Sequence, residues 1–143
     1  MKAKDFTAWN TTKEQLHNGK LNFRFRERDI FFMYVGVNVG FEQDGDTNFL
    51  RPVLVYKKFN KHVFLGIPLT SKIKEDKFHY EFNYTNETRS FAILSQLKLF
   101  DIKRAKYRDG QISKESFYKL QNKLLDLIVT PLEEPKGAHK SDL

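Results

Sequence analysis

Two short apolar runs near the middle of the chain predict a β-hairpin. Residues 52–56 and 62–67 are rich in β-branched and aromatic side chains, and the polar stretch between them is short enough for a hairpin loop. In an antiparallel pair, the start of one strand lies beside the end of the next. Arg51 opens the first run and Thr70 follows the second, so the pattern places both residues at the same edge of the sheet.

Three further stretches have the hydrophobic pattern of strands. Residues 29–37 are almost entirely apolar and predict a strand buried for much of its length. Residues 77–84 alternate aromatic with polar side chains, which predicts a half-buried strand, and residues 91–97 predict another that leads into residues 99–101. Residues 38–48 are rich in Gly, Asn and Asp and predict an exposed loop, as do the charged residues 71–77, and turns are predicted at residues 85–88 and at Asp109 and Gly110.

Two segments predict helices, one near each end of the chain. Thr11 and Glu14 have the spacing of a capping box, and with Gly19 as the terminating residue they predict a helix near residues 12–18. Trp9, just before it, is expected to pack this helix onto the body. Ser113 is expected to cap a second helix that Pro131 ends, with one apolar face made of Phe117, Leu120, Leu124, Leu127 and Ile128.

These elements predict a mainly β fold with flanking helices, of the α+β class. About five strands would form a small, strongly bent antiparallel sheet or a partly open barrel. We expect three regions: an N-terminal helical extension over residues 1–28, one domain over residues 29–130, and a flexible polar tail over residues 131–143.

Composition narrows the possible partners. The 25 Lys and Arg residues against 18 Asp and Glu give a net charge of +7, which favours a polyanion such as nucleic acid. The sequence has no cysteine, which excludes disulfides, thiolate catalysis and cysteine-bound metals. There is no apolar signal segment at the N-terminus and no stretch near the roughly 20 apolar residues that a membrane span needs, so we expect a soluble, cytoplasmic protein.

Arg51, Thr70 and Ser71 are the candidates for phosphate chemistry. A guanidinium and hydroxyl groups that meet at one edge of a sheet can bind a phosphate, and the guanidinium can stabilise the extra charge of a phosphoryl transition state. The structural alternative is a salt bridge at the rim of the sheet from Arg51 to Glu42 or Asp44. Ser and Thr are also ordinary loop residues, so the hydroxyl groups alone do not decide between the two.

The remaining motifs mainly exclude kinds of site, such as metal and nucleotide sites. The four histidines lack metal-ligand spacing; His62 or His79 could act as a base, but a structural role is the commoner one. Residues 44–48 imitate the start of a calcium loop, yet its sixth and twelfth positions would be Phe49 and Val55, so we reject it. Nucleotide-binding and metalloprotease motifs are missing, and neither a metal site nor a cofactor is predicted. The basic residues of 98–108 predict either a phosphate-binding patch or a solvated loop: Lys98, Lys103, Arg104, Lys106 and Arg108.

Taken in order, several short stretches make the chain resemble the MazF/PemK family of toxin endoribonucleases of type II toxin–antitoxin systems. They span roughly residues 27–130 and are residues 28–30, 40–45, 51–55, 67–71, 94–98 and 101–104. The resemblance implies an SH3-like, CcdB/PemK-like barrel that forms a homodimer and binds single-stranded RNA. It also implies an acidic antitoxin partner that blocks the RNA groove.

The resemblance further implies an activity and its residues. Single-stranded messenger RNA would be cleaved at selected sequences without a metal, by attack of the 2′-hydroxyl, to leave a 2′,3′-cyclic phosphate and a 5′-hydroxyl, and growth would be inhibited. Arg51 and Thr70 match the family's catalytic arginine and threonine. The positions that match the RNA groove are Glu42, Gln43, Ser71, Gln96 and Lys98.

Three departures from the family pattern concern the groove. Residues 46–50 are additional in the loop before Arg51, Phe41 stands where a small residue is common, and the N-terminal helix is additional. Two other functions stay open on the same barrel. One is a toxin that binds protein like the gyrase poison CcdB, although that mode uses a terminal tryptophan and the one tryptophan here is Trp9. The other is a silent RNA-binding barrel, against which the presence of both Arg51 and Thr70 argues.

Overall fold

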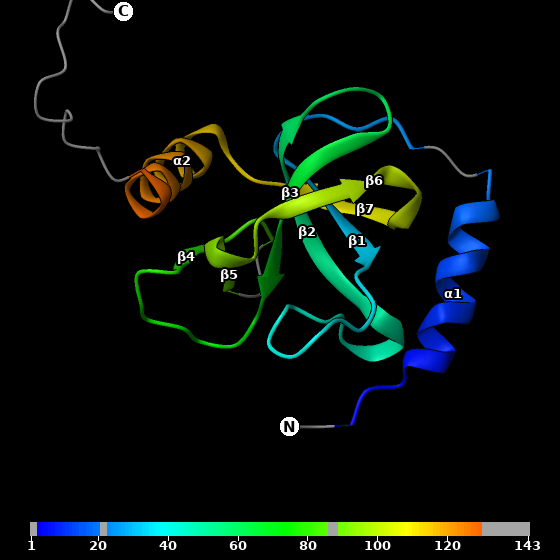
Figure 1. Ribbon diagram of the computed structural model, residues 1–143. Helices are drawn as coiled ribbons and strands as arrows, with labels where there is room; N and C mark the ends of the chain where they lie inside the picture. Colours follow the sequence, from blue (N-terminus) through cyan, green and yellow to red (C-terminus); the bar gives the residue numbers. More distant parts are fainter. Residues whose placement is uncertain (1–2, 21–22, 86–88, 130–143) are drawn as a thin grey trace, which may run out of the picture.

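The computed structural model describes residues 3–20, 23–85 and 89–129 and has a seven-stranded antiparallel sheet with a helix on either side (Figure 1). The predicted tail and residues 86–88 of a predicted turn lie outside these ranges. The elements in chain order are α1 (Phe6–Asn18), β1 (Asp29–Tyr34), η1 (Thr47–Phe49), β2 (Leu50–Lys58), β3 (Val63–Thr70), β4 (His79–Phe82), β5 (Ser90–Ile93), η2 (Leu94–Gln96), β6 (Lys98–Asp101), η3 (Ile102–Arg104), β7 (Ala105–Gln111) and α2 (Lys114–Ile128).

The central strand of the sheet is β3. It pairs along one edge with β2, and along the other edge with β6 at residues 63–66 and with β5 at residues 69–70. The strand order is β4-β5-β3-β2-β1-β7, with β6 beside β3, and the sheet is not closed within the described residues. The predicted mainly β, partly open barrel with an N-terminal and a C-terminal helix is therefore confirmed.

The strands bury side chains on both of their faces. In β1, Ile30 contributes to one apolar cluster and Phe31 to another, and in β2 the neighbours Val53 and Leu54 are divided in the same way. The cluster with Ile30 and Leu54 includes the buried face of α2, whereas the other cluster includes Phe25, Phe64 and Phe100. Successive side chains of a strand point to opposite faces, so a continuous apolar run is what such a doubly covered strand requires.

The C-terminal helix follows the prediction closely. The Ser113 hydroxyl accepts a hydrogen bond from the Ser116 amide at 3.1 Å, which is the expected N-cap. Phe117, Leu120 and Leu124 are buried against the sheet, but Ile128 is 59% exposed and does not belong to that face. Pro131 lies outside the described residues.

The N-terminal helix begins earlier than the sequence pattern predicts. The Asp5 carboxylate accepts from the Ala8 amide at 2.9 Å and caps the helix, so the predicted cap at Thr11 is wrong. The Thr11 hydroxyl donates instead to the Thr7 carbonyl one turn earlier, at 3.3 Å. Gly19 ends the helix as predicted, and Trp9 is buried.

The predicted strands differ from the observed ones in number and at their ends. Strand β1 stops at Tyr34, β4 is shorter than residues 77–84, and residues 94–96 form the short helix η2. The turn predicted at Asp109 and Gly110 is wrong: both residues lie in β7, where Ile30 pairs with Gly110 and Phe31 with Arg108. Asp109 is thus the extra residue of a β-bulge, which bends the strand without ending it.

Candidate functional site

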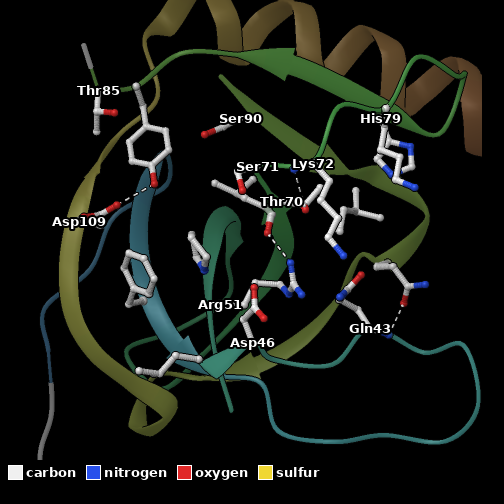
Figure 2. A pocket seen from close by; sticks show the side chains of 18 of the residues that line it. Gln43, Asp46, Arg51, Thr70, Ser71, Lys72, His79, Thr85, Ser90 and Asp109 are labelled. Carbon is white, nitrogen blue, oxygen red and sulfur yellow. Dashed lines mark hydrogen bonds between the residues drawn. The ribbon is translucent and has the colours of Figure 1, made fainter. Parts of the chain in front are cut away.

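The β2–β3 hairpin brings Arg51 and Thr70 to the same pocket. Val53 pairs with Pro68, and the same register continued by two residues places Arg51 opposite Thr70. Both residues line a pocket of about 770 Å³, in the middle of which Figure 2 shows them. The hairpin prediction therefore gave the right neighbourhood for these two side chains.

Two backbone carbonyl groups hold the Arg51 guanidinium. Its Nε donates to the Asp44 carbonyl at 2.7 Å, and its Nη1 donates to the Leu69 carbonyl at 3.1 Å. The predicted alternative, a salt bridge to Glu42 or Asp44, is absent among the described residues. The Asp44 carboxylate contacts Lys4, and that of Glu42 accepts from the Val39 amide.

The guanidinium keeps donors and charge for a ligand. Burial lowers the pKa of Arg51 from its usual value, and the carboxylates of Asp46 and Asp44 act in the opposite direction. A guanidinium has five N–H groups, of which the two carbonyls engage two, and within the described ranges no further acceptor contacts the rest. Arginine stays protonated in proteins, so the pocket holds a permanently charged, oriented anion-binding group.

The hydroxyl of Thr70 is also oriented. Its Oγ1 accepts from the Lys72 amide at 3.2 Å, as in a Ser/Thr turn, and its O–H remains able to donate to a phosphate oxygen. Ser71 follows at the same rim and lines the same pocket (Figure 2). The end of β3 thus presents two hydroxyl groups on the side of the pocket where Arg51 lies.

The other residues predicted at the groove divide between two adjoining hollows. Gln43 and Gln96 line the Arg51 pocket, and the backbone amide of Gln43 donates to the side-chain carbonyl of Gln96 at 3.1 Å. Glu42 and Lys98 line a smaller hollow of about 190 Å³, which Gln43 and Gln96 also border. Burial and, secondly, the charge of Arg104 lower the pKa of the Lys98 ammonium, so Lys98 lies in an environment that disfavours a bare charge.

The far wall of the pocket has polar groups that the sequence did not indicate. The Tyr84 hydroxyl donates to the Asp109 carboxylate at 2.7 Å, and burial and that carboxylate raise the pKa of Tyr84. Because the two residues are 25 positions apart, no local pattern could have paired them. His79, considered as a base, also lines the pocket; its Nδ1 lies 2.6 Å from the Asp76 carboxylate.

The basic stretch 98–108 is neither a continuous patch nor a loop. It comprises β6, η3 and β7, and several of its cations have partners within the fold. Arg104 donates to the Tyr34 carbonyl at 3.1 Å, Arg108 pairs with buried Asp29 at 3.1 Å, and Lys103 donates to the His17 carbonyl at 3.0 Å. Of this stretch, Lys98 is the residue that borders the hollows at the candidate site.

Two kinds of feature are absent from the part of the chain that the structure describes. In that part, no group of histidine and acidic side chains is arranged so that it could hold a metal ion. None of the helices there has the length and apolar character needed to cross a membrane.

Solved structures with this fold include several MazF toxins. MazF from Deinococcus radiodurans matches with a TM-score of 0.62 and 15% identity over 75% of this chain and 98% of that chain. The MazE–MazF structure from the same organism matches with a TM-score of 0.59 and 16% identity over 75% and 97% of the two chains. The toxin MazF-mt6 of Mycobacterium tuberculosis matches with a TM-score of 0.54 and 12% identity over 69% and 94%.

Identities this low show a common fold, whereas the family follows from the sequence itself. No match is found among curated proteins. The family model described as PemK-like, MazF-like toxin of type II toxin–antitoxin system matches residues 27–128, which include every strand of the sheet and α2. The chain therefore belongs to the PemK/MazF-like toxin family of type II toxin–antitoxin systems.

Proposed function

We propose that this toxin is an endoribonuclease that cleaves single-stranded messenger RNA without a metal and thereby inhibits growth. The observation that carries the proposal is the Arg51 guanidinium, fixed by two carbonyl groups beside the Thr70 hydroxyl in an open pocket. A fixed charge with free N–H donors is suited to a reaction in which negative charge develops on phosphate oxygens. Membership of the PemK/MazF-like family supports the same activity.

The proposed reaction needs no group from outside the RNA as nucleophile. The 2′-oxygen forms a bond to the adjacent phosphorus and the bond from phosphorus to the 5′-oxygen breaks. The 2′-hydroxyl proton passes to a base, and the leaving 5′-oxygen takes up a proton. The products are a 2′,3′-cyclic phosphate and a 5′-hydroxyl. Arg51 stabilises the pentacoordinate phosphorane, and Thr70 donates to one of its oxygens.

The RNA is proposed to extend from the Arg51 pocket into the adjoining hollow. Gln43, Ser71 and Gln96 line the pocket, and Glu42 and Lys98 line the hollow next to it. Amide and hydroxyl groups can select bases through hydrogen bonds, whereas Lys98 can contact a phosphate. These five residues are proposed as RNA contacts.

The remaining features of the proposal concern partners and organisation. One of the similar structures contains MazE together with MazF, and we propose a cognate antitoxin whose acidic segment covers the basic groove. We further propose a homodimer that acts in the cytoplasm, where messenger RNA is found. Residues 29–130 would form its toxin domain and residues 1–28 an extension.

The test compares cleavage of a long single-stranded RNA in EDTA by four proteins. Wild type should give discrete fragments with cyclic-phosphate ends. Arg51→Ala and Thr70→Ala should remain folded and lose activity, Arg51→Ala by at least about 10²-fold, as for loss of a donor that stabilises a developing charge. Arg24→Ala removes an exposed arginine outside the pocket and should cleave like wild type.

Four outcomes would contradict the proposal. Cleavage that survives Arg51→Ala would remove the arginine from the mechanism, and unfolding of this variant would assign it a structural role. RNA bound by wild type but left intact would favour the silent RNA-binding barrel. Capture of a protein target without RNA cleavage would favour a toxin that acts by protein contact.

A further inference from the structure

Helix α1 lies outside the region that matches the family, yet it contacts the loop that leads to Arg51. The match begins at residue 27, whereas α1 ends at Asn18. The loop, residues 35–49 between β1 and the start of β2, is here named the Arg51 loop. Figure 1 shows α1 along the side of the sheet, with its N-terminal end near η1, which belongs to this loop.

The first contact is polar and is made by Lys4, which lies just before the cap of α1. Its ammonium donates to the carbonyls of Asn38 at 2.5 Å and Gly40 at 2.9 Å, and lies 3.0 Å from the Asp44 carboxylate. An ammonium has three donors, so these partners use them all. The Lys4 side chain is 11% exposed, and water therefore competes weakly for it.

Asp44 connects this contact to the guanidinium. Its carboxylate binds Lys4 and also accepts from the Asn38 amide at 2.7 Å, while its carbonyl accepts from Arg51 Nε at 2.7 Å. One residue thus links the N-terminal segment to the catalytic candidate. A shift of Asp44 would turn the guanidinium about its remaining contact, the Leu69 carbonyl.

The second contact is apolar and is made by Trp9. Its ring lies 5.4 Å from that of Phe49 and so close to Gly36 that a Cβ on this glycine would be 2.0 Å from it. Phe49 and its neighbour Asn48 have φ angles of 65° and 56°, a conformation that side chains other than glycine rarely adopt. Such backbone persists where surrounding contacts stabilise it. Here the Trp9 ring packs on Phe49, whose carbonyl also accepts from the backbone amides of Val35 and Gly36.

We propose that the N-terminal segment, Lys4 together with α1, orients the catalytic candidate, with Lys4 and Trp9 as positioning residues for Arg51. Two departures from the family pattern, the added helix and the added residues 46–50, are in direct contact, since Trp9 packs on Phe49. Lys4, before the helix, binds Asp44, before the added residues. Together these contacts fix the Asp44 carbonyl and, through it, the direction of the guanidinium. This inference rests on the proposed ribonuclease activity.

The test replaces Lys4 and measures kcat and KM separately. Lys4→Ala should lower kcat about tenfold and change KM little, because a small misplacement of a catalytic group slows the chemical step. Lys4→Arg keeps the charge and the donors and should recover most of the loss. Lys20→Ala, an exposed lysine just after α1, is the matched control and should match wild type.

A double-mutant cycle separates positioning from general stability. In Arg51→Lys, the lysine cannot donate to the Asp44 and Leu69 carbonyls as Arg51 does. In this background, Lys4→Ala should cause almost no further loss of kcat. An equal, independent loss in both backgrounds would overturn the inference. So would a kcat for Lys4→Ala that matches wild type, or a loss that tracks the fraction of unfolded protein.

One further measurement does not depend on catalysis. Amide hydrogen exchange at Asn38 and Gly45 should accelerate in Lys4→Ala and remain unchanged in Lys20→Ala, since both amides are bonded within the Arg51 loop. If wild type fails to cleave RNA, the proposed function fails, and faster exchange still supports the contact of α1 with the loop. Unchanged exchange would overturn it whatever the activity.

Discussion

At the scale of single residues, the site depends on backbone acceptors as much as on side chains. Arg51 is held by the carbonyls of Asp44 and Leu69 and not by a carboxylate. A carboxylate at that position would neutralise the guanidinium and compete with a phosphate for it, whereas carbonyl groups orient it and leave its charge available. The arrangement therefore suits an anionic ligand better than the salt bridge that the sequence left open.

Lys98 should make the proposed binding of RNA depend on pH. Its pKa is lowered by burial and by Arg104, so in the free protein it loses its proton at a lower pH than the roughly 10.4 of an exposed lysine. A bound phosphate favours the charged form of Lys98. At pH values where part of Lys98 is deprotonated in the free protein, RNA binding should therefore be coupled to the uptake of a proton. Affinity for a 2′-deoxy oligonucleotide, which cannot be cleaved, should fall as the pH rises through the pKa of Lys98.

Fluorescence anisotropy of wild type and Lys98→Met over a series of pH values measures this effect. Other lysines contribute equally to both proteins, so the difference between the two affinities isolates Lys98. The difference should be greatest near neutral pH and shrink toward alkaline pH. A constant difference would show that Lys98 makes no charged contact with the nucleic acid.

At the scale of elements, the local sequence pattern predicted the strands and the helix cap that are determined by residues close together in the sequence. The apolar runs of β2 and β3 and the Ser113 cap of α2 were found correctly, and strand pairing then placed Arg51 near Thr70. The start of α1 was missed because Asp5 and Thr11 are both good caps, and the buried position of Trp9 in the first turns of the helix favours the earlier start.

The hydrophobic and polar pattern could not predict features that depend on residues far apart in the sequence. The bulge at Asp109 arises from pairing with β1 and is fixed by the bond from Tyr84. The contact of Lys4 with the Arg51 loop uses mainly carbonyl groups, which every residue has and which therefore leave no trace in the sequence. Loop contacts around a site are hard to infer for this reason.

Gly36 should tolerate substitution far less than Gly40. Both have positive φ, 84° and 55°, but a Cβ on Gly36 would overlap the Trp9 ring whereas one on Gly40 has open space. Gly40→Ala should cost about 1–2 kcal/mol of unfolding free energy from the backbone conformation alone. Gly36→Ala should cost a further 1–3 kcal/mol or so for the overlap.

Chemical denaturation measures this difference, and fluorescence locates it. The chain has one tryptophan and six tyrosines, so emission reports on Trp9 alone when the excitation wavelength is absorbed by indole and not by tyrosine. Gly36→Ala should shift the emission toward that of a solvated indole as α1 separates from the loop, and Gly40→Ala should not. Equal stabilities and equal spectra for the two variants would contradict the observed packing of Trp9.

At the scale of the whole molecule, the net charge overstates how many positive side chains are available to a ligand. Several of the 25 basic residues are engaged within the fold, among them Lys4, Lys103, Arg104 and Arg108. The cations that line the Arg51 pocket are Arg51, Lys72 and Lys74, opposed by the carboxylates of Asp46 and Asp109. On the proposed function, the attraction of RNA would depend on a few local charges, and the dependence of binding on salt concentration should give their number.

The dependence of binding on salt should differ between the two catalytic candidates. For single strands, the logarithm of the binding constant falls with the logarithm of salt concentration by about 0.7 per phosphate contact. Arg51→Ala removes a charged contact and should reduce this slope by about 0.7, whereas Thr70→Ala, a neutral change in the same pocket, should preserve it. Anisotropy titrations of both variants in increasing KCl provide the measurement, and identical slopes would place Arg51 away from the phosphates.

The β2–β3 hairpin determines where the length of this chain can change. Between Val53 and Val55 the paired positions follow one register, and beyond Val55 they follow another, because Tyr56 is an extra residue in a bulge. Residues added or lost in the connection 59–62 leave the opposite edge of the sheet unmoved. A residue added between Arg51 and the bulge would instead turn the guanidinium to the other face of the sheet, unless a second bulge absorbed it. We therefore expect changes of length at the tip of this hairpin to cost less activity than an insertion in the strand beside the pocket, even where a substitution in that strand is tolerated.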